Sequence, residues 1–535
     1  MSGPRIEPNP TAPGMPQRMV VILLDSLNRH LIGPYRDRAH VADAVGRVDG
    51  ERFETPNLDR FSQRATRFDR HYTGSLPCMP ARHDILVGAL DFLWRPWGSI
   101  ELWERPITDA LRQGGVTTHL FTDHPHLFET GGENYHVDFT AWDYQRGHEG
   151  DPWKTRPDPS WLGAPSFGRG WNGYDNSRGW FKGEGDFPGP RTMSAASSWL
   201  RNHAAHHDRF FVFVDEFDPH EPFDTPNDWA DRYDPTWEGP HLIWPPYKVG
   251  AVADGVISER DARQIRSCYG AKLSMIDHWF GKILDELDEQ NLWDTTAVMV
   301  TTDHGHYLGE DDVWGKPGTW IRETLSHTPL VMWWPGAPSL AGGSIDALTT
   351  NVDIHATIAD AFGVNDRITH RTHGRSLAPL LNGTATTVRD HLLTGVWGRE
   401  IQVVAADGTK YARAPHGANA PLSMWSNRWS TMPVHSLPDM RMPPPDHRAV
   451  LDRMPGSDIP VIRQPFAAGD PLPFWAYAKF DGNHLTNVVN DPAEREDRVG
   501  TGREERAAEE LLIHALEVVE APSDQFERLG LRSPA

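Results

Sequence analysis

The chain has 535 residues, of which 38% are hydrophobic and 24% charged, a composition typical of globular and not of disordered proteins. Its length predicts roughly two or three domains. The formal net charge of −22 disfavours nucleic acids and anionic membranes as partners, because binding to either requires a basic surface. Two cysteines exclude a disulfide framework, and no apolar run approaches the roughly 18 residues of a membrane span.

The N-terminal segment, residues 1–18, is polar and rich in proline. It lacks the apolar stretch that a signal peptide requires. We therefore expect a soluble, cytoplasmic protein with no membrane segment.

The first predicted element is a strand, MVVILL at residues 19–24, whose unbroken apolar run is typical of a central parallel strand. The next is a helix over residues 55–68, with Thr55 as N-cap, Pro56 at the first position and Ala65 on its buried face. Further buried strands are predicted at FFVFVDEF, which ends at Phe217, at 297–302 and at 329–334, and a long amphipathic helix is predicted at 263–290.

Strands that alternate with helices predict an α/β fold with a mostly parallel central sheet. After about Asn382 the pattern changes to short strands and turns, followed by a last helix from about Glu504. We therefore predict a large N-terminal domain over residues 1–385 and a smaller C-terminal α+β domain over 386–535. Two stretches, 147–189 and 415–471, have no clear periodicity, and their roles are left open.

Acidic and histidine residues follow several predicted strands. In an open α/β sheet, active groups gather beyond the carboxyl ends of the strands. Aspartate and histidine from different strands are suitable ligands for a divalent cation, although a single aspartate there is also typical of a helix cap or turn. These residues are Asp25, Asp215, Glu216, Asp218, His220, Asp303 and His304.

The two cysteines have different settings. Cys268 lies in the predicted helix SCYGAKL and is expected to be a core residue. Cys78 lies at a predicted turn between Pro77 and Pro80, with Arg82 four residues further on. A structural cysteine prefers a regular apolar setting, so Cys78 is a candidate for chemistry, with an unmodified buried cysteine as the alternative.

The segment CMPAR (78–82) resembles the Cys-x-Pro-x-Arg signature of the formylglycine-dependent sulfatases, in the alkaline phosphatase superfamily. Other segments resemble the same family in the family's order, from about Val20 to Val499. They are VVILLDSLNRHLIGPY, TPNLDRFSQRATRFDRHYTGSLPCMPAR, YGAKLSMIDHWFGKIL, VMVTTDHGHYLGEDDVWGKPG and NVVNDPAEREDRVG. The resemblance implies an alkaline-phosphatase-like sandwich, with a large central sheet flanked by helices and a smaller C-terminal domain with a short antiparallel sheet.

The resemblance also implies that Cys78 is oxidised after translation to formylglycine by a formylglycine-generating enzyme. One oxygen of the hydrated aldehyde would attack the ester, and the other would expel the product. Arg82, one helical turn along, would steady the diol and the esterified anion.

By the same resemblance, a single divalent cation is bound by Asp25, modified Cys78, Asp303 and His304. Ca²⁺ is the expected ion, with Mn²⁺, Mg²⁺ and Zn²⁺ as alternatives. Ser26 stands where many sulfatases have a second aspartate, and the nitrogen of His304 favours Mn²⁺ or Zn²⁺.

Further residues are matched to substrate contacts. Lys316 matches the lysine that binds the transferred anion. His220 matches the histidine that protonates the leaving oxygen or holds the anion, and protonation suits the ordinary pKa of histidine. The family's Lys-x-His segment is replaced by FTDHPHLFE, which has no lysine. From it, His124 is expected to contact the substrate or leaving group, and His126 the substrate. Asn28 is either a substrate contact or a helix cap.

We therefore expect a sulfuric-ester hydrolase that acts on a small-molecule or saccharide sulfate. A phosphonate monoester or phosphodiester hydrolase of the same superfamily is the alternative. A catalytically dead binding protein is disfavoured, because the cysteine, Arg82 and both metal aspartates are present. The substrate and any assembly into homo-oligomers are left open.

Overall fold

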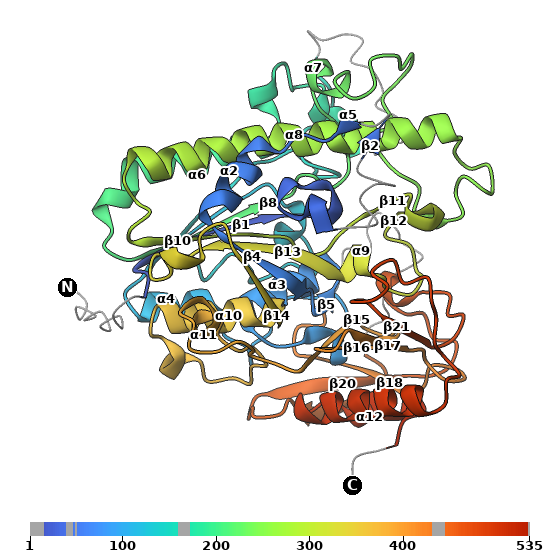
Figure 1. Ribbon diagram of the computed structural model, residues 1–535. Coiled ribbons are helices and arrows are strands. Elements are labelled where there is room, and N and C mark those ends of the chain that lie inside the picture. Colours follow the sequence, from blue (N-terminus) through green and yellow to red (C-terminus); the bar gives the residue numbers. More distant parts are fainter. Residues whose placement is uncertain (1–14, 39–46, 49–50, 159–171, 431–444, 533–535) are drawn as a thin grey trace.

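The apolar run near the start of the chain forms β1 (Arg18–Leu24), which lies inside a sheet of eight strands (Figure 1). The computed structural model describes residues 15–38, 47–48, 51–158, 172–430 and 445–532. Residues 1–14 lie outside this part. They make up most of the N-terminal segment in which we looked for a signal peptide. Successive side chains of β1 point to opposite layers, so that both faces of the strand are buried, as predicted for a central strand.

The strands of the large sheet follow the order β14-β4-β13-β10-β1-β8-β6-β7. Their bounds are β4 Thr66–Tyr72, β6 Thr117–Thr122, β7 Ala141–Tyr144, β8 Phe210–Glu216, β10 Thr296–Thr301, β13 His327–Trp333 and β14 Ser344–Thr350. Among these described strands, only β13 runs antiparallel to its neighbours. The predicted mostly parallel α/β sheet is confirmed.

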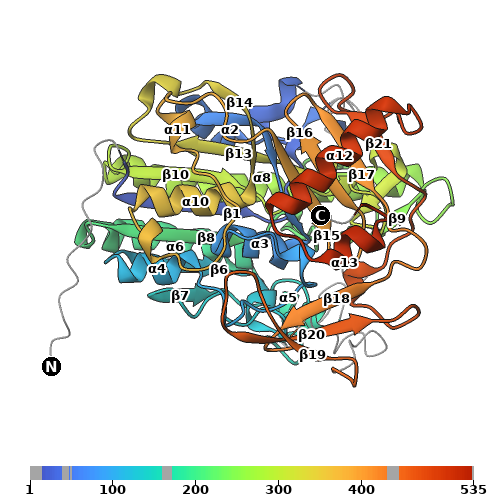
Figure 2. The ribbon, with the colours of Figure 1, turned by 90° about the horizontal axis from the view of Figure 1, so that it is seen from below.

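Helices cover both faces of this sheet (Figure 2). One face packs against α2 (Pro56–Arg64), α6 (Pro188–His203) and α8 (Glu259–Glu289), and the other against α3 (Cys78–Val87), α4 (Ile107–Gln113) and α10 (Asn351–Ala361). The long predicted helix is confirmed as α8. Cys268 lies within it, 1% exposed and in the hydrophobic core, as expected.

The helix predicted over residues 55–68 was too long. Thr55 and Pro56 do start α2, but the helix ends at Arg64, and Ala65 is an extended C-cap. The last predicted turn belongs instead to β4, which pairs with both β13 and β14. The apolar spacing continued smoothly across Ala65, so only these long-range strand pairings determine where the helix stops.

The C-terminal part contains a five-stranded sheet of order β21-β17-β16-β15-β5. Four strands come from this part: β15 His391–Val396, β16 Ile401–Ala405, β17 Thr409–Arg413 and β21 His484–Asn487. The edge strand β5 (Ser75–Leu76) comes from the N-terminal part and pairs parallel with β15. The segment directly before Cys78 is therefore fixed by the C-terminal sheet. The last long helix is α12 (Arg503–Val518), close to its predicted start.

The stretch 415–471 is more regular than its sequence indicated. It contains a three-stranded antiparallel sheet of β18 (Leu422–Ser426), β20 (Pro460–Phe466) and β19 (Val450–Arg453). Residues 431–444 of this stretch, like residues 159–171 of the other aperiodic stretch, lie outside the described residues. Among the helices that the structure describes, none has the length and apolar character needed to cross a bilayer.

Candidate active site

The carboxyl ends of three neighbouring strands bring acidic residues together. Asp25 directly follows β1, Asp215 lies near the end of β8, and Asp303 follows β10 by two residues. In the sheet, β1 lies between β10 and β8, with Leu23 paired to both Thr301 and Asp215. Three aspartates far apart in the sequence thus meet at one edge of the sheet, where the parallel topology places active groups.

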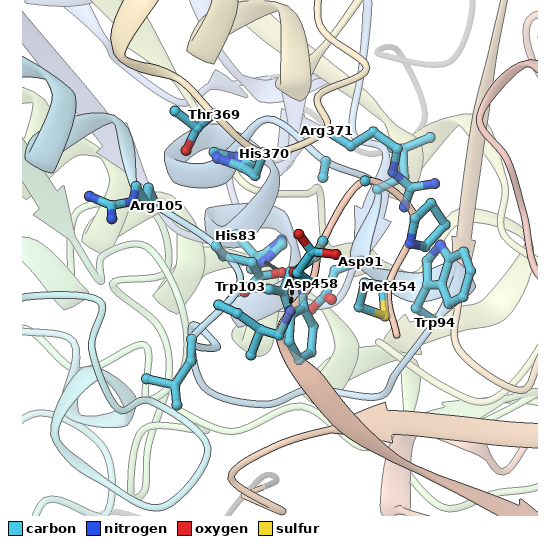
Figure 3. A pocket seen from close by; sticks show the side chains of 18 residues that line it. His83, Asp91, Trp94, Trp103, Arg105, Thr369, His370, Arg371, Met454 and Asp458 are labelled. Carbon is cyan, nitrogen blue, oxygen red and sulfur yellow. Dashed lines mark hydrogen bonds and ion pairs between the residues drawn. The ribbon is translucent and has the colours of Figure 1, made fainter. Parts of the chain in front are cut away.

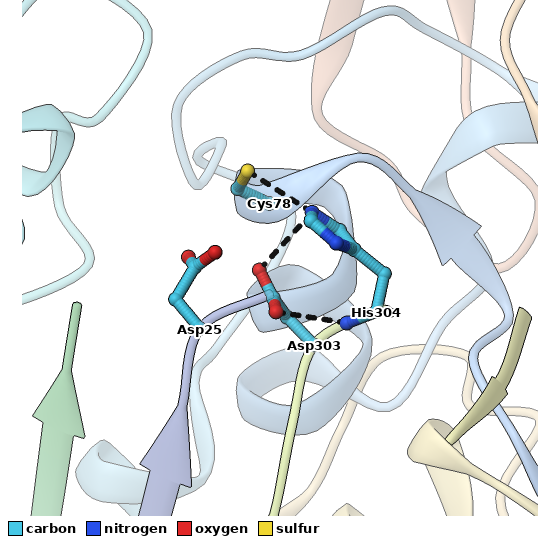
Figure 4. Close-up of side chains that lie close together, drawn as sticks. All are labelled: Asp25, Cys78, Asp303 and His304. Atoms are coloured by element: carbon cyan, nitrogen blue, oxygen red, sulfur yellow. Dashed lines mark hydrogen bonds and ion pairs between the residues drawn. The ribbon is translucent and has the colours of Figure 1, made fainter. Parts of the chain in front are cut away.

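Four predicted ligands form one buried cluster. The ligand atoms of Asp25, Cys78, Asp303 and His304 all lie within 4.8 Å of one another (Figure 4). The His304 Nε2 atom is 3.1 Å from Cys78 Sγ and 3.4 Å from an oxygen of Asp303. The Nδ1–H of His304 donates to the Gly305 carbonyl at 2.9 Å, and burial lowers the pKa of the ring, so Nε2 carries a lone pair. Two carboxylates and one imidazole nitrogen suit a divalent cation.

Cys78 is the first residue of α3 and is 2% exposed, so the expected turn is in fact the buried start of a helix. A helix N-terminus favours negative charge. The thiol itself is not ionised, because burial, and then the adjacent Asp25, raise its pKa well above the ordinary value. Unmodified Cys78 is therefore a weak nucleophile.

Arg82 links the aspartates of the site. Its guanidinium makes a two-pronged contact with Asp215, from Nε to Oδ2 at 2.9 Å and from Nη2 to Oδ1 at 2.7 Å. Nη2 also lies 2.9 Å from Asp25, and Nη1 lies 2.8 Å from Asp303. Burial acts to lower the pKa of Arg82, but the three aspartates, Asp215 first, hold it well above its ordinary value. Arg82 is thus a permanent positive charge at the centre of the site.

Asp215 received no role from the sequence, although its place at a strand end was noted. The missing information was the pairing of β8 beside β1, which puts Asp215 next to Asp25. Once the strand order is known, the position of Asp215 itself points to the site, because it lies near the end of the strand that neighbours β1.

Lys316 and His220 form a hydrogen-bonded pair. Lys316 Nζ lies 2.8 Å from His220 Nε2, and His220 Nδ1 lies 2.7 Å from the Glu221 carbonyl, to which it donates. Burial, assisted by Lys316, lowers the pKa of His220 to about 4. Burial acts to lower the pKa of Lys316, but the acidic groups around it, Glu221 first, together raise it above its ordinary value. At neutral pH the histidine is therefore uncharged and accepts a hydrogen bond from the ammonium group.

Ser26 connects this pair to the metal cluster. Its hydroxyl donates to Asp25 at 2.8 Å and accepts from Lys316 at 3.3 Å, and its backbone N–H donates to Asp303 at 3.1 Å. Its φ of 60° is uncommon for a residue with a side chain. Ser26, which stands where many sulfatases have a second aspartate, thus lies within the candidate site.

His124 and His126 lie beside the cluster in different charge states. His124 Nε2 is 3.5 Å from Asp25, and burial, followed by Arg82, lowers its pKa well below the ordinary value. His126 lies 3.1 Å from both Glu129 and Glu149. These glutamates, Glu149 first, outweigh burial and raise the pKa of His126 to about 10. His126 is therefore an imidazolium near the site, and its substrate contact stays a prediction.

The oxygen and the nitrogen of the Asn28 side chain both make hydrogen bonds within the protein. Its oxygen caps a short helix by accepting from the His30 N–H at 3.0 Å, and its amide donates to the His306 carbonyl and to Glu310. These contacts account for the capping alternative, and a substrate contact from Asn28 stays a prediction.

Solved structures share this fold. A protein from Bacteroides thetaiotaomicron, described in connection with the metabolism of multiple glycosaminoglycans, superposes with a TM-score of 0.62 and 16% identity over 97% of this chain and 100% of its own. A phosphonate monoester hydrolase of Agrobacterium radiobacter superposes with a TM-score of 0.60 and 16% identity over 94% of this chain and 95% of its own. At these identities the likeness concerns the fold, which is the predicted alkaline-phosphatase-like sandwich.

Sequence comparisons identify the family. The choline-sulfatase of Rhizobium meliloti is 26% identical over 404 residues, which span 69% of this chain and 72% of the relative. The sulfatase family model matches residues 17–364, which include Cys78 and strands β1 and β10. The chain therefore belongs to the sulfatase family, whose members hydrolyse sulfuric esters.

Proposed function

We propose that this protein hydrolyses a sulfuric ester with a formylglycine nucleophile made from Cys78, assisted by one divalent cation. The observation that carries the proposal is the convergence of Asp25, Cys78, Asp303 and His304 within 4.8 Å, at the start of a helix and the ends of two strands. The chemistry of the buried thiol supports modification, because a protonated Cys78 is a weak nucleophile. A formylglycine-generating enzyme would be the maturation partner, and the hydrated aldehyde would supply an oxygen nucleophile.

Asp25, Asp303 and His304 would hold the cation. When bound, the cation would polarise the oxygens of the ester as a Lewis acid. Carboxylate oxygens favour Ca²⁺ or Mg²⁺, whereas the lone pair of His304 Nε2 makes Mn²⁺ or Zn²⁺ suitable as well. Arg82 restrains both aspartates, so that their oxygens stay in place before the cation arrives.

The Lys316–His220 pair would act on the leaving group. The ammonium of Lys316 orients the anionic ester, and its hydrogen bond to His220 Nε2 places a proton between the two residues. To protonate the leaving oxygen, His220 would first take up a proton from solvent at Nε2 while Lys316 turns from it to the anionic ester, and Glu221, 4.0 Å from Lys316, would stabilise the charge of that lysine.

Charge at the site favours a singly charged group. Three carboxylates, those of Asp25, Asp215 and Asp303, face two protonated side chains, Arg82 and Lys316. Together with a divalent cation, this set has a single net positive charge. Sulfate monoesters and phosphodiesters have one negative charge, whereas phosphate monoesters have up to two.

The first prediction ranks substrates. We expect kcat/KM for p-nitrophenyl sulfate to exceed that for bis-p-nitrophenyl phosphate, and both to exceed that for p-nitrophenyl phosphate, on one modified preparation. If the diester ranks first, the protein is a phosphodiester or phosphonate hydrolase instead. If the phosphate monoester ranks first, the charge argument is wrong.

The second prediction concerns the nucleophile. Protein produced together with a formylglycine-generating enzyme should contain a Cys78 peptide about 18 Da lighter than the unmodified one, and Cys78→Ala should lose nearly all turnover. Cys268→Ala, in the core of α8, is the matched control: it should keep its turnover while losing about 1 kcal/mol of stability. Full turnover by Cys78→Ala would exclude the proposed nucleophile.

The third prediction concerns the metal. Chelation should abolish turnover, and Asp303→Asn should weaken metal affinity by about 10-fold or more, because it removes one charged ligand. Asp294→Asn, an exposed change just before β10, should behave like wild type. A fully active protein shown by elemental analysis to be free of metal would contradict the assignment.

The fourth prediction concerns Asp215 as a positioning residue for Arg82. Asp215→Asn should lower kcat by about 10- to 100-fold with little change in KM, because the guanidinium loses its two-pronged partner and shifts against the metal ligands. Asp215→Glu should recover part of the loss. The matched control is Asp234→Asn, which breaks a similar contact between a buried aspartate and Arg260 away from the Cys78 cluster. Equal kcat values for the two asparagine variants would show that Asp215 contributes only to stability.

A further inference from the structure

A second cluster of ionisable side chains lies behind the loop that carries His220. It consists of Asp123, His148, Glu216 and Asp218, which we call the Asp123 cluster. The four residues are 0–2% exposed. The Phe217 ring packs against both His148, at 4.6 Å, and His220, at 4.2 Å between ring centroids.

Each carboxylate of the Asp123 cluster has one oxygen engaged. Asp123 Oδ1 accepts from the Phe217 N–H at 2.8 Å, and Glu216 Oε1 accepts from the Asp218 N–H at 3.2 Å. Asp218 Oδ1 contacts His148 Nε2 at 2.6 Å and Lys272 at 2.8 Å. The engaged oxygens fix the orientation of all three carboxylates.

The remaining atoms of the cluster have no hydrogen-bond partner among the described residues. They are Asp123 Oδ2, Glu216 Oε2, Asp218 Oδ2 and His148 Nδ1. With Nε2 of His148 in contact with Asp218, Nδ1 is the ring nitrogen left to bind a cation. The ligand atoms of Asp123, His148 and Asp218 lie within 4.8 Å of one another. Buried polar atoms without partners are unfavourable, and their convergence is the arrangement that a cation would satisfy.

Charge leads to the same conclusion. The cluster holds three carboxylates, and Lys272 is the lysine in contact with it. Arg191 is another cation near Asp123. It is only partly buried, and its Nη2 donates to the Arg146 carbonyl. The three buried acidic side chains thus share one contacting lysine, and proteins balance such a cluster by binding a metal ion or protons.

The backbone of α6 closes the cluster at Gly189. A Cβ atom at this position would lie 2.4 Å from Asp218 Oδ2 and 2.7 Å from Glu216 Oε1. Only glycine allows the helix to approach these carboxylates so closely.

Another cluster, formed by His83, Asp91 and Glu104, provides a contrast (Figure 3). It lines a cavity of about 250 Å³. There Arg95 contacts Asp91 at 2.7 Å and Glu104 at 3.2 Å, and His83 contacts Glu104 at 2.9 Å. This cluster has its own internal cation, so its acidic residues do not require a metal.

We propose that the Asp123 cluster binds a second divalent cation, with Asp123, His148 and Asp218 as ligands and Glu216 as an additional oxygen donor. Oxygen donors with one imidazole nitrogen make Mn²⁺ a suitable probe. The ion would link the end of β6 to the loop 217–220. It would thereby keep His220 at hydrogen-bonding distance from Lys316 without contacting the substrate.

The experiment is a titration of chelator-treated protein with MnCl₂, with free Mn²⁺ measured by electron paramagnetic resonance. At free Mn²⁺ concentrations too low to fill the weakened Asp303→Asn site, wild type should bind two equivalents, Asp303→Asn one, Asp123→Asn one, and the double variant none. His148→Gln should also bind one equivalent. It replaces Asp123→Asn in the experiment if circular dichroism shows that Asp123→Asn does not fold. Asp91→Asn, in the contrasting cluster, should bind as wild type does.

The Asp303→Asn variant decides the question even if no variant of the Asp123 cluster folds. It leaves this cluster intact, so absence of Mn²⁺ binding by Asp303→Asn would overturn the proposal and leave protons as the neutralising species. Equal stoichiometry for wild type, Asp123→Asn and His148→Gln would also overturn it. If Asp303→Asn still bound as much as wild type, the predicted active-site metal would fail instead, so the two outcomes are distinguishable.

Discussion

The structure depends most on the contact of one guanidinium with three carboxylates. Arg82 extends from α3 to the ends of β8, β1 and β10, where it meets Asp215, Asp25 and Asp303. A buried charge without a partner is strongly unfavourable, and removal of one partner from a buried pair typically costs about 3–5 kcal/mol. The three strands and the helix are therefore held in the relative positions that bring Cys78 next to Asp25, Asp303 and His304. The geometry of the candidate site and the stability of the fold depend on the same contact.

Charge neutralisation also explains the states of the histidines. His124 and His220 stay uncharged because burial and a neighbouring cation outweigh the acidic groups near them, whereas His126 is charged because two glutamates flank it. One residue type thus has different charge states at nearby positions, according to its neighbours.

Much of this arrangement followed from the sequence, because a parallel sheet converts strand ends into a common site. The positions of Asp25, Asp303 and His304 could be predicted in this way, and local helix signals located the start of α2. The end of α2, the antiparallel direction of β13 and the role of Asp215 could not be predicted, since each depends on which strands become neighbours. The burial of Cys78 was also missed, because two prolines indicated a turn where the first turn of a helix accepts them.

The pairing of β5 with β15 has a consequence for the order of events during synthesis. Leu76, two residues before Cys78, has its strand partner at Val396, so the nucleophile segment cannot reach its final conformation until most of the chain has left the ribosome. At about 5–20 residues per second, that delay is on the order of tens of seconds. Throughout this interval the Cys78 segment lacks its strand partner, so a formylglycine-generating enzyme of the kind proposed would meet it before it is buried. The strand pairing would then set the time available for the proposed oxidation.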